Sequence, residues 1–204
     1  MKSRPVAALA LALGLASLSA SPAAQSSGAK LHFTAFAVNL SNVATGATLL
    51  LEIDVNSWTT DAERARLIET ATAEGHTQDA LLKMLRDLPK RGRMWAPQWQ
   101  GPDPLNARLG WDLRYAHQTP TDEGGRRVVL ATDRYIGFWE ARTQPRTIDY
   151  PFTLIQIEVD KDGRGQGKMS VATRIRFDET RKVLELENYA SEPVRLNDVK
   201  MTIR

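Results

Sequence analysis

Alternating apolar and polar positions dominate the chain from residue 31 onward and predict β-strands. The clearest case is 47–57, where Leu49, Leu51, Ile53 and Val55 share one face. Polar residues fill the intervening positions, which is the period-two pattern of a half-buried strand. Similar alternation or apolar runs predict further strands at 31–40, 108–116, 126–132, 153–159, 169–177, 184–187 and 194–203. Of these, the run 126–132 is apolar enough to be buried on both faces.

The hydrophobic period changes to that of a helix within 60–88. Thr60 and Glu63 stand at capping-box spacing, so a helix is expected to begin at Asp61. Thr77 can cap a second helix, in which leucines recur at helical spacing. The segment therefore predicts a helical hairpin between strands. A DNA-reading helix-turn-helix is the alternative, and the near-zero charge and the leucine-rich second helix argue against it.

The remaining segments predict turns and one long loop. Residues 90–107 are rich in Pro and Gly and are expected to form the loop. Gly165 and Gly167 are interpreted as turn residues with positive φ that precede the strand 169–177. The last strand changes phase at Asn197 and Asp198, which indicates a β-bulge.

These elements predict an α+β, mainly β fold. The last four strands follow one another through short links, which is typical of an antiparallel meander. The expected architecture is an antiparallel sandwich or open barrel, with the helical hairpin inserted after the second strand.

The first 23 residues have the pattern of a secretory signal peptide. Lys2 and Arg4 form a basic start, an apolar run follows to Leu18, and Ser21 and Ala23 stand at the spacing of a cleavage site. The apolar run is shorter than the roughly 20 residues that a membrane span needs. We therefore expect export to the periplasm or the medium. Residues 24–30 would be a flexible leader and residues 31–204 a single β-rich domain.

Composition narrows the functions that remain. The 204 residues include no Cys, which excludes disulfides, thiolate metal sites and a Cys nucleophile. The formal charge is +3, and removing Lys2 and Arg4 with the signal leaves 25 basic residues against 24 acidic ones. A mature chain so close to neutral has no electrostatic footprint for nucleic acid.

The metal and nucleophile motifs are weak. Asp160, Asp162 and Gly163 could begin a calcium loop, but Arg164 follows at a ligand position, so a plain hairpin turn is favoured. The three His residues lie far apart in the sequence, and no Ser stands in a nucleophile elbow. No metal and no cofactor is therefore expected.

Carboxylates carry the catalytic hypothesis. Glu140 lies among aromatic residues and beside Arg142, a setting that can raise a carboxyl pKa. It could act as the acid of a glycan hydrolase, with Asp112 or Asp149 as the second carboxylate. Asp112 also lies two positions from Arg114, and the simpler interpretation is a surface pair between these two residues.

Tryptophans carry the binding hypothesis. Trp95 and Trp99 lie in the expected loop, where exposed rings could stack on a sugar or hold an apolar ligand. Trp139 and Arg142 are further candidates because they flank Glu140.

Four segments resemble a group of exported bacterial proteins to which no function is assigned. The resemblance implies export and a single domain, and it supplies no catalytic residues. It rests on Gly110-Trp111-Asp112-Leu113-Arg114-Tyr115-Ala116, Phe138-Trp139-Glu140-Ala141-Arg142, Asp149-Tyr150-Pro151-Phe152-Thr153-Leu154-Ile155 and Glu187-Asn188-Tyr189-Ala190.

Two functional hypotheses follow. The first is a non-enzymatic protein of the cell envelope that binds a small apolar or sugar ligand, or an envelope protein, on its sheet. The second is an acid/base hydrolase of envelope glycans or similar polymers. The absence of a strong catalytic motif favours the first.

Overall fold

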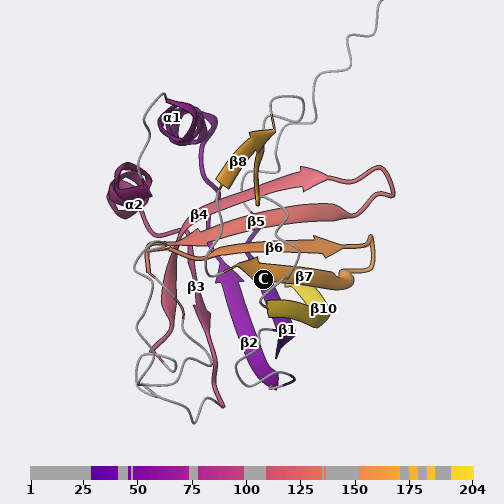
Figure 1. Ribbon diagram of the computed structural model, residues 1–204. Helices are drawn as coiled ribbons and strands as arrows, with labels where there is room; N and C mark the ends of the chain where they lie inside the picture. The colour runs from indigo at the N-terminus through magenta and orange to yellow at the C-terminus, as the bar shows by residue number, and fades with distance from the viewer. Residues whose placement is uncertain are drawn as a thin grey trace, which may run out of the picture.

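The computed structural model is mainly β, with two helices (Figure 1). It describes residues 29–40, 46, 48–73, 78–98, 109–134, 136, 152–170, 175–178, 183–186 and 194–204. The helices are α1 (Asp61–Thr72) and α2 (Gln78–Asp87). The strands are β1 (Leu31–Asn39), β2 (Thr48–Val55), β3 (Gly92–Trp95), β4 (Trp111–Pro120), β5 (Arg126–Thr132), β6 (Leu154–Val159), β7 (Arg164–Ser170), β8 (Ile175–Asp178), β9 (Val183–Leu186) and β10 (Val194–Ile203).

Eight of the strands form a closed antiparallel barrel. The order around the barrel is β1-β10-β7-β6-β5-β4-β3-β2, and the pairing of β1 with β10 closes it. The mainly β, antiparallel prediction is confirmed, and the barrel is closed rather than open. The expected four-strand meander at the C-terminal end is wrong, because among the described strands β8 pairs with β9 in a separate sheet and β10 returns to β7.

The barrel interior is filled by apolar side chains. Alternate residues of β1 and β2 point inward, as their period-two pattern predicts. Phe33, Leu51, Ile53 and Ile157 are fully buried in this cluster. Eight strands leave an interior that side chains alone can fill, so the described interior is a packed core.

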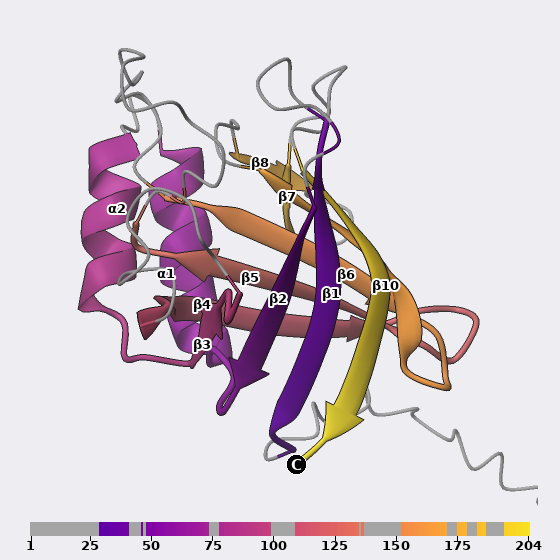
Figure 2. The ribbon, with the colours of Figure 1, turned by 90° about the horizontal axis from the view of Figure 1, so that it is seen from below.

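A second apolar cluster lies between the helical hairpin and the outer face of the barrel. Leucines of α1 and α2 pack there against Tyr115, Ala131 and Leu154 of neighbouring strands. In Figures 1 and 2 both helices lie on the side of the barrel away from β10. Strand β5 is therefore covered on both faces, since Val128 and Leu130 point into the barrel and Ala131 points toward the helices. The predicted helical hairpin after the second strand is confirmed. The prediction that the segment 126–132 is buried on both faces is also confirmed.

A bulge in β4 shows that one prediction about which side chains share a face of the strand is wrong. The alternation along 108–116 predicts that Leu109, Trp111, Leu113 and Tyr115 share one face of a strand. The pairing with β5 shifts between Leu113 and Tyr115, so Leu113 points into the barrel and Tyr115 points toward the helices. Leu109 lies before the strand and is 55% exposed.

The strand boundaries correct two further expectations. The segment 92–95 is not loop but strand β3, which pairs with β2 and β4. Gly165 and Gly167 lie within β7 rather than in the preceding turn, and only Gly163 of the three has a positive φ. A Cβ on Gly165 would lie 1.8 Å from the backbone oxygen of Glu158. Glycine at this position therefore lets β7 approach β6 closely. From the sequence alone, the same glycines were interpreted as residues of a turn.

The bulge predicted in the last strand is confirmed. The pairing of β10 with β7 shifts between Leu196 and Val199, and Asp198 has a φ of 50°. The change of phase along the sequence was therefore a direct sign of the extra residue.

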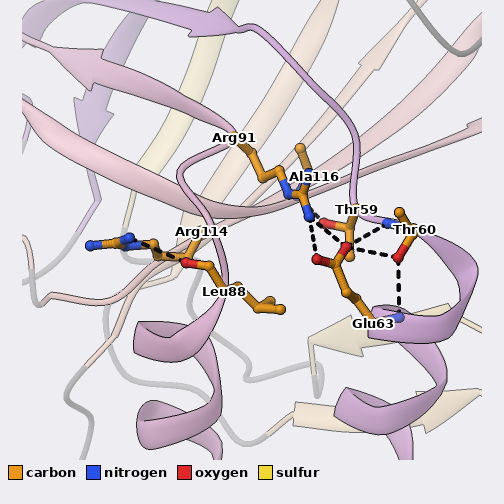
Figure 3. A network of polar contacts seen from close by, with 7 residues as sticks. All are labelled: Thr59, Thr60, Glu63, Leu88, Arg91, Arg114 and Ala116. Atoms are coloured by element: carbon orange, nitrogen blue, oxygen red, sulfur yellow. Dashed lines mark hydrogen bonds and ion pairs between the residues drawn. The ribbon is translucent and has the colours of Figure 1, made fainter.

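A polar cluster fastens the hairpin to the barrel (Figure 3). Thr60 and Glu63 form the predicted capping box at the start of α1. The Glu63 carboxylate also accepts hydrogen bonds from Nη2 of Arg91, which is buried next to β3. Thr59 binds the edge of β4, donating its N–H to Ala116 and accepting the N–H of Ala116 on its hydroxyl. One carboxylate therefore links the helix cap to the barrel wall.

We predict that Glu63→Gln lowers the free energy of unfolding by about 3 kcal/mol, because it leaves the buried Arg91 guanidinium without its carboxylate. Urea denaturation followed by circular dichroism measures this change. Glu69→Gln, at an exposed position of the same helix, is the matched control and is expected to stay within about 0.5 kcal/mol. Equal stability of the two variants would contradict the role given to Glu63.

Candidate functional site

Trp95 is the predicted binding residue that the structure describes. It lies at the end of β3 on the outer face of the barrel and is half-buried. The Arg93 guanidinium carbon lies 6.0 Å from its ring centroid, and the His32 ring lies 6.3 Å away. These neighbours make the ring part of a packed surface rather than of a loop. Trp99, Trp139 and Arg142 lie outside the described residues.

Asp112 is the one predicted carboxylate that lies within the described part of the chain. Asp112 pairs with Lys90 at 2.6 Å, so the expected pair with Arg114 is wrong. Arg114 instead binds Asp133 and the backbone oxygen of Leu88. Glu140 and Asp149 lie outside the described residues, so their distance from Asp112, and with it the hydrolase hypothesis, stays a prediction.

The turn that could have been a calcium loop is held by its own side chain. Oδ1 of Asp160 accepts the backbone N–H groups of Asp162 and Arg164, and Lys161 contacts Asp162. No cluster of three potential metal ligands occurs among the residues that the structure describes. None of the described helices is long and apolar enough to cross a membrane.

Two histidines lie in different surroundings. Nδ1 of His32 lies 2.7 Å from Asp54, whose carboxylate also binds the Arg204 side chain. This group joins β1, β2 and the last residue of the chain. His117 is buried beneath α1, where Tyr115 and Arg64 are its neighbours.

Burial sets the protonation of the groups beneath α1. Burial, together with the positive charge of Arg64, lowers the pKa of His117 to about 4, against an opposing effect of Asp61. Burial also raises the pKa of Tyr115 to about 12. Both side chains are therefore neutral near pH 7. A neutral imidazole covered by a helix suits packing rather than proton transfer with a ligand.

The described outer surface has a polar cleft of about 380 Å³ across β6, β7 and β10. This volume lies within the usual range of small-ligand sites. The cleft is lined by Gln156, Glu158, Gln166, Gly167, Lys168 and Arg195. None of these residues was selected from the sequence as a site.

Strand register places the cleft residues in two rows. Arg195 lies opposite Lys168, and Lys168 lies opposite Gln156, so one row crosses three neighbouring strands. Gln166 lies opposite Glu158 in the second row. Directly opposed side chains have Cβ atoms about 5 Å apart, close enough for one small molecule to contact several of them.

The charged side chains of the cleft differ in their partners. Oε1 of Glu158 accepts from Nε of Arg127 at 2.6 Å and from Nε2 of Gln156 at 3.3 Å. Lys168 is half-buried, and in the described part of the chain no hydrogen bond or ion pair engages its ammonium group. The charged side chains of the lining are Lys168, Arg195 and Glu158. Glu158 is paired with Arg127 of β5, and Arg195 also has a polar or charged partner.

The sequence held only an indirect signal of this cleft. Its polar positions alternate with core positions along each strand, so they looked like an ordinary solvated face. The alignment of Arg195 with Lys168 depends on β10 leaving the expected meander and pairing with β7. That pairing was not predicted.

Comparison of the chain with models of protein families, with curated proteins and with solved structures finds no match. The geometry of the described residues must therefore carry the functional argument.

We predict that stability falls as the pH is lowered from about 7.5 to about 5. An unfolded chain protonates His117 below its ordinary pKa of 6.5, whereas the folded protein keeps it neutral down to about 4. Between these two pKa values the folded state binds fewer protons than the unfolded state. The contribution of His117 to the free energy of unfolding is therefore fully present above pH 6.5 and is lost as the pH falls toward 4. The expected loss is up to about 2 kcal/mol at pH 5.

Urea unfolding of the wild type and of His117→Phe at both pH values measures this effect. The variant is expected to lose less stability between the two pH values, because its side chain does not titrate. An equal loss in both proteins would show that His117 does not cause the pH dependence.

Proposed function

We propose that the protein is exported and acts by binding, with a small polar ligand held in the outer cleft across β6, β7 and β10. The observation that carries the proposal is the cleft itself, whose walls combine amide, carboxylate and cationic side chains. Such groups hydrogen-bond to the hydroxyl and charged groups of a polar ligand. The signal-like segment 1–23 supports export to the periplasm or the medium.

Two features favour the outer face over the barrel interior as the binding surface. The described interior is packed with fully buried apolar side chains such as Phe33 and Ile157. The helical hairpin covers a different part of the outer face, against β4 and β5. The polar lining also favours a sugar-like ligand over an apolar one.

Native mass spectrometry of the mature protein, purified from its own cell envelope, tests this proposal. We expect a reproducible extra mass that disappears on denaturation. The double variant Gln156→Ala/Gln166→Ala is expected to lose most of it, since both amides line the cleft. Gln98→Ala, at an exposed position outside the cleft, is the matched control and is expected to retain it.

A bare mass for the wild type would overturn the small-ligand proposal. An extra mass that persists in the double variant would overturn the assignment to this cleft.

A further inference from the structure

We infer that acidification releases the helical hairpin of α1 and α2 from the outer face of the barrel, while the eight barrel strands stay paired. The group that responds to acid is His117, which lies beneath α1. The released element is distinct from the proposed binding site, because the hairpin packs against β4 and β5 whereas the cleft lies across β6, β7 and β10.

The topology allows the hairpin to leave without opening the barrel. The hairpin is inserted between β2 and β3, and these two strands pair directly with each other up to Val55 and Gly92. Beyond this pair, the N–H groups of Asn56 and Ser57 donate to the backbone oxygen of Arg91. Both ends of the insert are thus held together by hydrogen bonds that do not involve the helices. The apolar cluster under the hairpin is also separate from the cluster inside the barrel.

The layer beneath the start of α1 is incompletely hydrogen-bonded. Among the described residues, Nε1 of Trp58 and the Nε atoms of Arg64 and Arg91 are buried without a hydrogen-bond partner. All three residues lie at the base of the hairpin, since Trp58 shortly precedes α1, Arg64 is in its first turns and Arg91 directly precedes β3. A buried donor without an acceptor costs stability. Opening returns these donors to water, which lowers the free energy of opening below what the apolar contacts alone would give.

The charged groups around His117 favour opening when its imidazole is protonated. The side chain is buried on the face of β4 that α1 covers, with Tyr115 beside it on the same strand. From α1, the positive charge of Arg64 and the negative charge of Asp61 act on it, and Arg64 has the larger effect. The opposite residue on β5 is Val129, which is uncharged. A proton on His117 therefore adds a second cation beside Arg64 in a buried layer, which is unfavourable.

Opening removes the two causes that lower the pKa of His117, which are burial and the charge of Arg64. The imidazole then meets water, and its pKa returns from about 4 toward 6.5. Between these values the open state binds more protons than the closed state, so acid favours opening. Lowering the pH from 7.5 to 5 is expected to raise the population of the open state about 25-fold. Glu63 stays ionised over this range, because its pKa in the folded protein is lowered from 4.5.

Thiol labelling of the full mature protein tests the opening, because the chain contains no Cys of its own. Ala71→Cys places a reporter on α1 beneath the hairpin, and Ala37→Cys places the matched reporter inside the barrel on β1. A pyridyl disulfide labels each variant at pH 7.5 and at pH 5. Each labelling rate is divided by the rate of the same variant unfolded in urea at the same pH.

We expect the thiol on α1 to be labelled faster than the thiol on β1 at pH 5, by at least about tenfold in normalised rate, because local opening needs less free energy than opening of the barrel. The normalised rate of Ala71→Cys is expected to rise about 25-fold between pH 7.5 and pH 5.

Two further substitutions, each combined with Ala71→Cys, identify the responsible groups. His117→Phe removes the titrating side chain and is expected to abolish most of the rise with acid. Arg64→Met removes the cation that acts on His117 and is expected to make the rise smaller, since burial alone still lowers the pKa of the imidazole. Arg66→Met, at an exposed position of α1, is the matched control and is expected to keep the full rise.

Three results would overturn the inference. Equal normalised rates for the two thiols at pH 5 would show that the whole protein opens rather than the hairpin. A rate for Ala71→Cys that is the same at both pH values would exclude control by acid. An undiminished rise in the His117→Phe variant would exclude His117 as the responsible group.

Discussion

The antiparallel pairing of β1 with β10 is the contact on which the rest of the structure depends. It joins residues 31–39 to residues 194–203 and closes the barrel. Closure removes the open sheet edges that would otherwise pair with other chains. It also seals the apolar interior, since every barrel strand then has a neighbour on both sides. Because the interior is filled, we place recognition on the outward-facing side chains.

The outer face is divided between two uses. One part, on β4 and β5, is covered by the helical hairpin, which the Glu63–Arg91 contact fastens beside β3. Another part, on β6, β7 and β10, carries polar side chains around a cleft. The glycines of β7 let that strand approach β6 closely. The same barrel wall thus supports a helical layer on one side and the proposed site on the other.

Local patterns predicted the fold better than the site. Alternation along 47–57 and the capping box at Thr60 are properties of neighbouring residues, so they could be read directly. Strand β3 was missed because four residues among Pro and Gly carry too little periodicity. The cleft was missed for a different reason. Lys168 and Arg195 meet only through the pairing of β7 with β10, which is a long-range contact.

A crystal structure of the protein purified with its native ligand tests the central claim most directly. The account predicts a bound molecule across β6, β7 and β10, within hydrogen-bonding distance of the amide groups of Gln156 and Gln166. A ligand found inside the barrel, or against Trp95, would contradict it.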